Sequence, residues 1–254
     1  MENRIMAHDE TVEKMFALIT SMNKPYYNHC GKLMIESFER HWRGIDLYCY
    51  NESFKFKNKR WTMMGWELGE TYNSFYRRWT SKNRKVTNFG KKAFSIIHAM
   101  KNIPCDWLIW ADADSEATRD ISKQLLELMA DPQYLSVHFG VKHTVDDKTY
   151  FSCETGFFML NTHHPLYKEF CKTYESIYAN DDKENLRRYY DGEVYGETVL
   201  RMQAKGAKML DLNKGHLHKT PIPRSVLGPY ISHYKAGLKE EIDFEEKIKE
   251  ATQR

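Results

Sequence analysis

The feature that most constrains the fold of this chain is a short apolar run that ends in two acidic residues. In the sequence DWLIWADAD, residues 106–114, five apolar residues from Trp107 to Ala111 are followed by Asp112 and Asp114. A near-continuous apolar run of this length is typical of a strand in a parallel sheet that is covered on both faces. Open α/β sheets bind their ligands outside the carboxyl ends of such strands, so we expect a site at the two aspartates.

The order of the other elements predicts an α/β fold. Apolar runs at 15–22 and 46–51 flank a segment, 28–41, whose apolar residues recur at helical spacing, and this β-α-β order indicates a parallel sheet. Helices are predicted at 91–101, 118–130, 165–178 and 195–205, and strands at 134–140, 157–161 and 207–212. We expect one domain over 1–254 with a mixed, mainly parallel central sheet flanked by helices. A basic, aromatic insertion is expected at about 52–90 and a C-terminal helix at about 239–252.

Composition excludes several classes of protein. The five cysteines are scattered and never occur in C-x-x-C spacing, which argues against a disulfide framework or a zinc ribbon and favours a reduced compartment. The N-terminal sequence MENRIMAHDETVEK has no apolar core of a signal peptide, and no apolar run is long enough to cross a bilayer. We therefore expect a cytoplasmic protein without a transmembrane segment.

The two aspartates have the spacing of metal ligands. Two carboxylates two residues apart leave an extended chain on the same face. Oxygen ligands suit a hard cation such as Mg²⁺ or Mn²⁺, which completes its shell with water and substrate phosphates. We predict that Asp112 and Asp114 hold an ion that neutralises charge on a diphosphate leaving group. The alternative is a polar loop in which Asp114 caps a helix that begins near Ser115 or Thr118.

The sequence WADAD, after its apolar strand, resembles the D-x-D motif of glycosyltransferases with the GT-A fold, which use nucleotide-sugar donors. Three further segments resemble parts of these enzymes. GKKAFSIIHAMKN is similar to the helix before the motif, CETGFFMLN to the acceptor-side segment, and HYKAGLK to the late histidine motif. The resemblance implies a GT-A (Rossmann-like) fold, an Mn²⁺ or Mg²⁺ ion and a nucleotide-sugar donor, with UDP as the commonest nucleotide.

The same resemblance implies roles for the late motif. His233 would complete the metal site, and Lys239, six residues later, would contact the diphosphate. The motif of these enzymes has its glycine three residues after the histidine, whereas Gly237 is four residues after His233. The alternative for His233 is a surface histidine.

Four carboxylates could serve as a catalytic base: Glu154, Asp191, Glu193 and Glu197. Transfer of a sugar needs an activated acceptor hydroxyl, and a nearby carboxylate is a suitable general base. Asp191 is our first candidate and Glu193 the second, because the sequence YYDGEVYGE is expected at the start of a helix. Glu154 is a third candidate. The alternative for Asp191 and Glu193 is that their charges complement the dipole at the helix N-terminus.

Four further residues are candidates for donor binding. Thr20 and Asn51 end the first two predicted strands, where the base and ribose of a nucleotide are expected, although ordinary turn chemistry also explains them. Of Lys91 and Lys92, we expect that one reaches the diphosphate and that the other is solvated.

The acceptor is the most open question. The whole chain carries a net charge of only +3, yet residues 55–92 hold eleven Lys or Arg and two acidic residues. Aromatic residues are interleaved with this charge: Phe54, Phe56, Trp61, Trp66, Tyr72, Phe75, Tyr76 and Trp79. This composition suits a phosphate backbone and unstacked bases, so one hypothesis is that the acceptor is a hydroxymethylated base in DNA.

Two other functions stay open. A glycan or lipopolysaccharide acceptor is the main alternative, in which case the basic segment is a solvated face. A nucleotidyltransferase that makes nucleotide sugars is the other, but such enzymes usually need a Gly-rich loop after the first strand. The corresponding sequence here, TSMNKPYYNHCG, has no glycine before Gly31.

Overall fold

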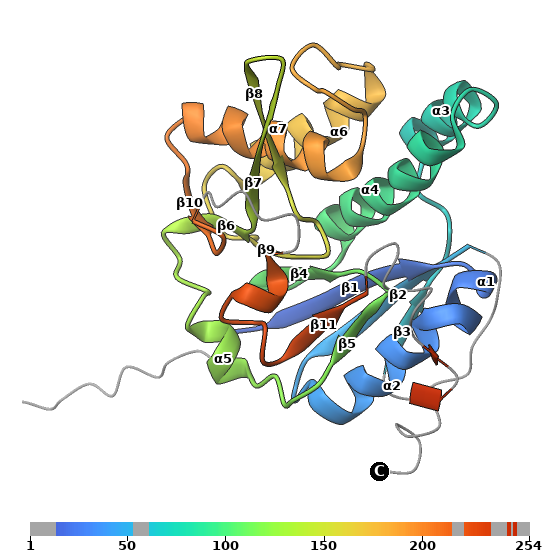
Figure 1. Cartoon of the computed structure of the whole chain (residues 1–254), viewed down its shortest axis with the longest axis vertical. Helices are drawn as coiled ribbons and strands as arrows, with labels where there is room; N and C mark the ends of the chain where they lie inside the picture. Colours follow the sequence, from blue (N-terminus) through green and yellow to red (C-terminus); the bar gives the residue numbers. More distant parts are fainter. Residues whose placement is uncertain (1–13, 53–60, 215–220, 235–242, 245, 248–254) are drawn as a thin grey trace, which may run out of the picture.

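A seven-stranded sheet crosses the middle of the molecule, with helices on both of its faces (Figure 1). The computed structural model describes residues 14–52, 61–214, 221–234, 243–244 and 246–247. The strand order is β10-β6-β9-β4-β1-β2-β3, and within this sheet only β9 runs opposite to its neighbours. The strands are β1 (Phe16–Met22), β2 (Asp46–Asn51), β3 (Trp61–Met64), β4 (Trp107–Ala111), β6 (Tyr134–His138), β9 (Phe157–Asn161) and β10 (Lys208–Asp211). The predicted fold class is therefore confirmed.

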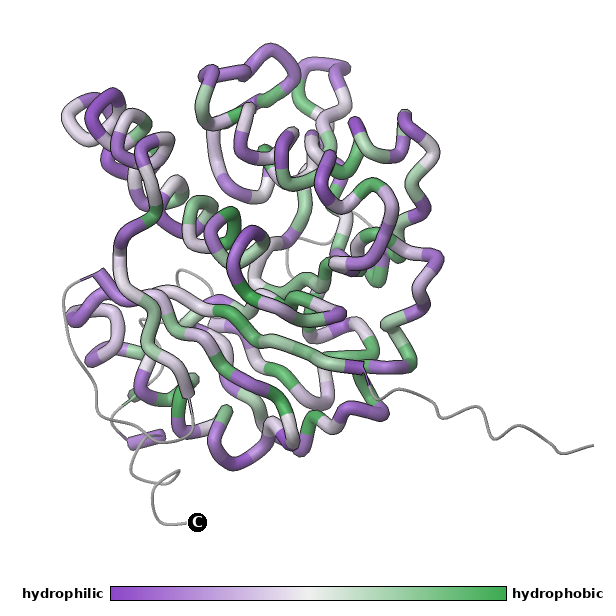
Figure 2. The backbone as a smooth tube through the Cα atoms, turned by 180° about the vertical axis from the view of Figure 1, so that it is seen from behind, coloured by the Kyte–Doolittle hydropathy of each residue, from purple (hydrophilic) through white to green (hydrophobic). Residues whose placement is uncertain are grey.

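Both faces of the central strands are buried, which explains their continuous apolar character. In β1, Ala17 and Ile19 pack in one apolar cluster with α4 (Arg84–Asn102), α6 (Tyr167–Ala179) and α7 (Asp191–Ala204). Leu18 and Met22, on the other face, pack in a second cluster with α2 (Lys32–His41) and α5 (Lys123–Glu127). Figure 2 shows the strands as mostly hydrophobic and the tip of the hairpin formed by α3 (Glu70–Trp79) and α4 as hydrophilic.

Two small sheets build the edge where the main strands end. β7 (Gly140–Val145) and β8 (Lys148–Cys153) form a hairpin whose two turn residues, Asp146 and Asp147, both have positive φ angles of 48° and 60°. β5 (Ser115–Ala117) pairs antiparallel with β11 (Ile231–His233), in a register that places His233 opposite Ser115. This second pairing joins the chain just after β4 to a segment more than a hundred residues later.

Some predicted boundaries change. The first helical segment begins earlier than expected, as α1 (Lys24–Tyr26), and passes through a π-helical turn (Tyr27–Gly31) into α2. The long helix begins at Arg84 rather than 91, because the Asn83 side chain accepts hydrogen bonds from Lys85 N and Val86 N. A 3-10 turn, Ile222–Arg224, precedes β11.

The helix predicted at 118–130 is wrong for most of its length. Residues 115–117 form β5 because they pair with β11, and only Lys123–Glu127 is helical, with Ser122 as its N-cap. The predicted insertion at 52–90 contains β3, α3 and the first turns of α4. The predicted C-terminal helix lies almost entirely outside the described residues. Among the described helices, none combines the length and apolar character needed to span a membrane.

Candidate active site

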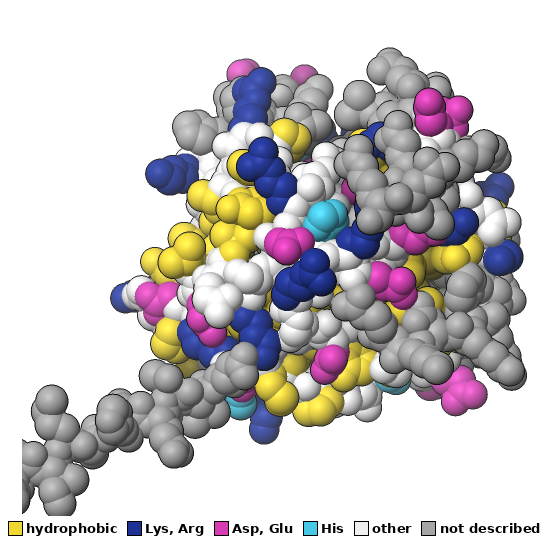
Figure 3. Space-filling model, turned by 90° about the horizontal axis from the view of Figure 1, so that it is seen from below, with side chains coloured by type: hydrophobic (Ala, Val, Ile, Leu, Met, Phe, Trp, Pro, Cys, Tyr) yellow, Lys and Arg dark blue, Asp and Glu magenta, His cyan; other side chains and the backbone are white. Residues whose placement is uncertain are grey.

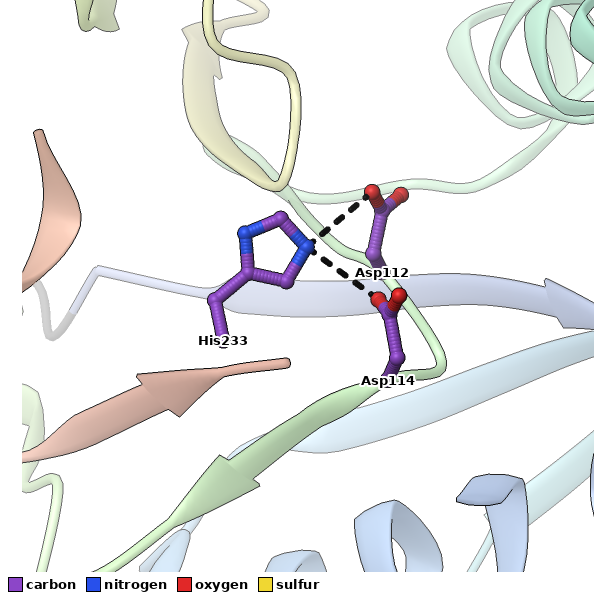
Figure 4. Close-up of side chains that lie close together, drawn as sticks. All are labelled: Asp112, Asp114 and His233. Carbon is purple, nitrogen blue, oxygen red and sulfur yellow. Dashed lines mark hydrogen bonds and ion pairs between the residues drawn. The ribbon is translucent and has the colours of Figure 1, made fainter. Parts of the chain in front are cut away.

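The two aspartates after β4 meet His233 at the carboxyl edge of the sheet (Figure 4). His233 Nε2 lies 3.1 Å from Asp114 Oδ1 and 3.6 Å from Asp112 Oδ2. One ligand atom from each of the three side chains lies within 4.8 Å of the others. The β5–β11 pairing creates this cluster, since it brings His233 beside the residues that follow Asp114. No helix begins at Ser115, so Asp114 does not act as a helix cap.

The two carboxylates have different surroundings. The Asp114 side chain is 7% exposed, and its Oδ2 accepts a hydrogen bond from the Tyr26 hydroxyl at 2.9 Å. The Asp112 side chain is 24% exposed, and its Oδ1 accepts from Lys92 Nζ at 2.6 Å and from Trp110 Nε1 at 2.8 Å. Burial alone would raise the pKa of Asp112, but the charges of Lys92 and His233 outweigh it and hold that pKa below its usual value.

The two carboxylates favour the protonated form of the His233 imidazole when no metal ion is bound. Burial would lower the pKa of its imidazole, but the hydrogen bonds to Asp112 and Asp114 raise it to about 9. A metal ion bound between the two carboxylates would replace that proton, because a histidine must be neutral to act as a ligand. Two carboxylate oxygens and one imidazole nitrogen form a donor set that Mn²⁺ and other divalent cations accept, so these residues fit a metal ion.

Lys92 joins the cluster to the start of α7. Its ammonium lies 2.9 Å from Asp191 Oδ2, donates to Thr155 O at 2.8 Å, and stands 5.4 Å from the centre of the Trp110 indole. Lys91 forms an ion pair with Glu52, and both side chains are 20% exposed. Both lysines are therefore held by acidic side chains, and neither has the solvated ammonium that we expected of one of them.

The three predicted carboxylates are all buried near the cluster but are held differently. Asp191, the first residue of α7, accepts a hydrogen bond from Thr155 Oγ1 at 2.6 Å in addition to its contact with Lys92. Glu193 binds the Arg187 side chain at 3.2 Å and the Arg188 backbone N–H at 2.5 Å.

Glu154 stands behind His233. It accepts from the backbone N–H of Gly156 at 3.0 Å, and its carboxylate lies 3.8 Å from His233 Nδ1. The carboxylate therefore faces the ring nitrogen that points away from the aspartates. Metal-binding histidines commonly donate their second N–H to a carboxylate, and Glu154 lies on that side of the ring at ion-pair distance.

Two pockets of similar size meet at Asp112, and we name them by the elements that border them. The β1-side pocket has a volume of about 320 Å³ and is lined by Ser21, Met22, Asn23, Tyr26, Glu52, Asn88, Phe89, Lys91, Lys92, Trp110, Asp112, Ala113 and Asp191. The α7-side pocket has a volume of about 290 Å³ and is lined by Phe89, Asp112, Asp114, His143, Ser152, Cys153, Glu154, Thr155, Arg187, Tyr190, Asp191, Gly192, Glu193 and His233. Phe89, Asp112 and Asp191 belong to both.

Two of the residues predicted to bind a nucleotide do not line either pocket. Thr20 is completely buried within β1, and Asn51 is buried at the end of β2. The residues that follow them in the sequence line the β1-side pocket instead. These are Ser21 to Asn23, which follow Thr20, and Glu52, which follows Asn51. Lys239 lies outside the described residues.

Several rings in the described part of the basic, aromatic segment belong to the core. Tyr72 and Phe75 are buried and cannot stack on a base, Trp66 and Trp79 are partly buried against the same apolar cluster, and Tyr76 is exposed. Four of its cations are paired with acids: Arg77 with Glu70, Arg78 with Asp181, Lys91 with Glu52, and Lys92 with Asp112 and Asp191.

Three other cations of this segment, Lys82, Arg84 and Lys85, are exposed around the turn between α3 and α4. On the face seen in Figure 3, basic side chains are interspersed with acidic ones. The described part of the segment therefore offers a small exposed group of cations and not a continuous basic surface.

Solved glycosyltransferases share this architecture. The galactosyltransferase LgtC, solved with donor and acceptor sugar analogs, superposes with a TM-score of 0.53 at 13% identity over 92% of this chain and 95% of its own. The bifunctional glycosyltransferase WbbM gives a TM-score of 0.58 at 12% identity over 95% of this chain. Mouse xyloside xylosyltransferase 1 gives 0.51 at 12% identity over 78% of this chain and 84% of its own. The chain has the GT-A fold.

These similarities establish the fold that the D-x-D resemblance implied. This chain spans 50% of the length of the WbbM chain. No family model and no curated protein matches the sequence. At this level of identity the function has to be argued from the site, because one fold supports many activities.

Proposed function

We propose that this chain is a metal-dependent glycosyltransferase that moves a sugar from a nucleoside diphosphate donor to an acceptor hydroxyl. The observation that carries the proposal is the cluster of Asp112, Asp114 and His233, which stands at the carboxyl edge of a GT-A sheet where two pockets meet. A donor has two parts to place, a nucleotide and a sugar. Two adjoining pockets with a candidate metal site at their border suit such a molecule.

We assign the nucleotide to the β1-side pocket and the transferred sugar to the α7-side pocket. The first lies at the ends of the parallel strands β1 and β2, the usual position for nucleotides in open α/β sheets. The diphosphate would then lie at the border, near Asp112 and Lys92. A divalent cation bound there neutralises the negative charge that develops on a departing diphosphate. UDP is the donor nucleotide that we would test first.

We assign the catalytic carboxylate to Asp191. Of the three candidates it alone lines both pockets, so it is the carboxylate nearest the point of transfer. Thr155 and Lys92 fix its position, which suits a group that must meet an acceptor hydroxyl with defined geometry. Glu193 is engaged by Arg187 and Arg188, and its role is to order the chain before α7. Glu154 orients His233.

We propose a carbohydrate acceptor in preference to DNA. The acceptor hydroxyl has to meet the transferred sugar at the α7-side pocket, which brings together Asp112, Asp114, Glu154, Asp191 and Glu193. Carboxylates accept hydrogen bonds from sugar hydroxyls, whereas they repel a phosphodiester backbone. The burial of Tyr72 and Phe75 also removes two of the rings on which the DNA hypothesis depended. A hydroxymethylated DNA base remains the competing acceptor in the experiments below.

Binding of a nucleotide with metal tests the proposal directly. We expect UDP with Mn²⁺ to raise the melting temperature more than either alone, and we expect a UDP-sugar to lose its sugar when incubated with the protein, as seen by mass spectrometry. Asp112→Asn and Asp114→Asn should abolish both effects. Asp46→Asn, an exposed aspartate at the opposite end of β2, is the matched control and should behave as the wild type. Stabilisation that is independent of Mn²⁺ and persists in both site variants would contradict the proposal.

A further inference from the structure

Tyr26 contacts the candidate metal ligand Asp114 from the side of the β1-side pocket. Its hydroxyl donates to Asp114 Oδ2 at 2.9 Å, while Asp114 Oδ1 lies 3.1 Å from His233 Nε2. The two oxygens of this buried carboxylate therefore have different neighbours, one on each side. With Oδ2 bound to the phenol, Oδ1 is directed into the cluster.

The same tyrosine forms part of the wall of the β1-side pocket. The chain reaches it by a short, constrained turn after β1. Asn23 Oδ1 accepts a hydrogen bond from Tyr26 N at 2.8 Å, and Pro25 stands at the beginning of α1. The local backbone therefore places Tyr26 so that its hydroxyl contacts Asp114 and the residue lines the β1-side pocket.

We propose that Tyr26 is a positioning residue that couples metal binding at Asp114 to nucleotide binding in the β1-side pocket. The inference rests on the proposed function, which supplies the metal and the nucleotide. A residue that forms a hydrogen bond with one oxygen of a ligating carboxylate orients the other oxygen toward the metal before the ion binds. Substitution of such a residue typically weakens metal affinity about 10- to 100-fold. The hydrogen bond from Tyr26 does this for Asp114.

The coupling follows from the two contacts of one side chain. A nucleotide that packs against the Tyr26 ring restrains the phenol, and thus restrains Asp114 in the orientation that receives the ion. By linkage, the metal must favour the nucleotide by the same factor. A diphosphate would also bind the metal directly, so the protein's own contribution has to be measured with a ligand that has no phosphate.

The experiment is a set of Mn²⁺ titrations by calorimetry on the full chain, with and without saturating uridine. Uridine lacks the phosphates that would bind Mn²⁺, so any effect it has on Mn²⁺ affinity passes through the protein. We expect uridine to tighten Mn²⁺ binding in the wild type. In Tyr26→Phe, the Kd for Mn²⁺ alone should rise about tenfold, and uridine should no longer change it.

Two further variants isolate the hydroxyl. Tyr26→Met also removes it but packs differently, so a loss shared by Tyr26→Phe and Tyr26→Met is due to the hydroxyl and not to a change in packing. Tyr134→Phe, in β6 and outside both pockets, is the matched control and should bind Mn²⁺ as the wild type does. Melting temperatures in EDTA show whether the variants remain folded.

The outcomes separate this inference from the proposed function. If the wild type binds Mn²⁺ and Tyr26→Phe binds it equally well, Tyr26 does not position Asp114 and the inference is wrong, while the proposed function stands. The inference also fails if uridine leaves the Mn²⁺ affinity of the wild type unchanged, or still changes that of Tyr26→Phe. If the wild type does not bind Mn²⁺ at all, the proposed function and the inference fail together.

Discussion

The two pockets that meet at Asp112 have similar volumes but are built from different parts of the fold. The β1-side pocket is formed by the ends of parallel strands and the turn after β1. Among its lining residues that do not border the other pocket, Glu52 and Lys91 form an ion pair. The α7-side pocket is formed by the end of β8, the turn after it and the first turn of α7. It holds Glu154, Arg187, Glu193 and His233, whose charges are already held by neighbours.

This difference suggests a division of labour. A pocket at strand ends, with fewer charged side chains than its neighbour, is suited to holding a ligand of fixed shape. A pocket of buried charges in fixed positions is suited to chemistry, because the groups need little reorganisation when charge moves during a reaction. Substitutions on the β1 side should therefore change donor affinity, whereas substitutions on the α7 side should change the rate of transfer. Asp191 and Asp112, which belong to both, should show the largest effects.

The largest effect is expected for Asp191→Asn. Loss of a general base typically lowers the rate about 10²- to 10⁴-fold, and we expect kcat to fall within this range. Binding of UDP should change less than kcat, because the contact of Asp191 with the donor site runs through Lys92, which keeps its contact with Asp112. Steady-state transfer rates and calorimetric binding of UDP measure the two quantities separately.

Glu193→Gln is the comparison for that prediction, since Glu193 lies in the same first turn of α7 but is bound to Arg187. We expect a smaller loss of kcat together with a lower melting temperature. If Glu193→Gln lowers kcat more than Asp191→Asn does, the assignment of the catalytic carboxylate is wrong.

Gly156→Ala should damage the metal cluster without altering a ligand. A Cβ at Gly156 would lie 2.3 Å from His233 Cε1 and 2.5 Å from its Nδ1, so the imidazole would have to move. We expect the Kd for Mn²⁺ to rise about tenfold or more, as for other losses of ligand orientation. Gly65→Ala is the control, because a Cβ there meets no atom within 4 Å. Equal Mn²⁺ affinity in Gly156→Ala and Gly65→Ala would show that His233 is not a ligand.

Lys91→Met tests the β1-side pocket. We expect Lys91 to leave Glu52 and bind a phosphate when the donor binds. Because a hydrogen bond to a charged group contributes about 1.5–3 kcal/mol, its loss in Lys91→Met should raise the Kd for UDP about tenfold. The rate of transfer at saturating donor should change little. Lys101→Met is the control, because Lys101 lies on the same helix and pairs with Glu175 but is far from both pockets. Similar UDP affinities of the two variants would remove Lys91 from the donor site.

The sequence was most informative where local pattern and position in the sheet agree. The apolar run Trp107–Ala111 is buried on both faces, so its carboxyl end could be placed at the edge of the sheet, and the positions of Asp112 and Asp114 followed. His233 was reached only through the resemblance of its motif. It stands 119 residues from Asp114, and the three-residue strand that positions it, Ile231–His233, has no strong local signal.

The aromatic segment carried a second signal besides its composition. Tyr72, Phe75 and Trp79 have the i, i+3, i+7 spacing of one helix face, which predicts packing against a core. Composition alone favoured a binding surface. Tyr26 and Thr155 could not have been found from sequence, because their importance lies in single contacts with Asp114 and Asp191 from other parts of the chain.

The smallest effect is expected for the exposed cations between α3 and α4, and it decides between the two acceptors. Replacing Lys82, Arg84 and Lys85 together by alanine should leave stability within about 0.5 kcal/mol, because these side chains are exposed. Transfer to a carbohydrate acceptor should be unchanged.

Binding of the wild type to duplex DNA, measured at 50 mM and 200 mM salt, should be weak and should fall steeply with salt, as for nonspecific contact with phosphates. A triple variant of the exposed lysines Lys168, Lys172 and Lys208, which lie outside the α3–α4 turn, is the control for net charge. If the wild type transfers sugar to hydroxymethylated DNA and the triple variant loses that activity while the control keeps it, the acceptor is DNA, and the cations of the α3–α4 turn, not the acidic α7-side pocket, determine acceptor choice.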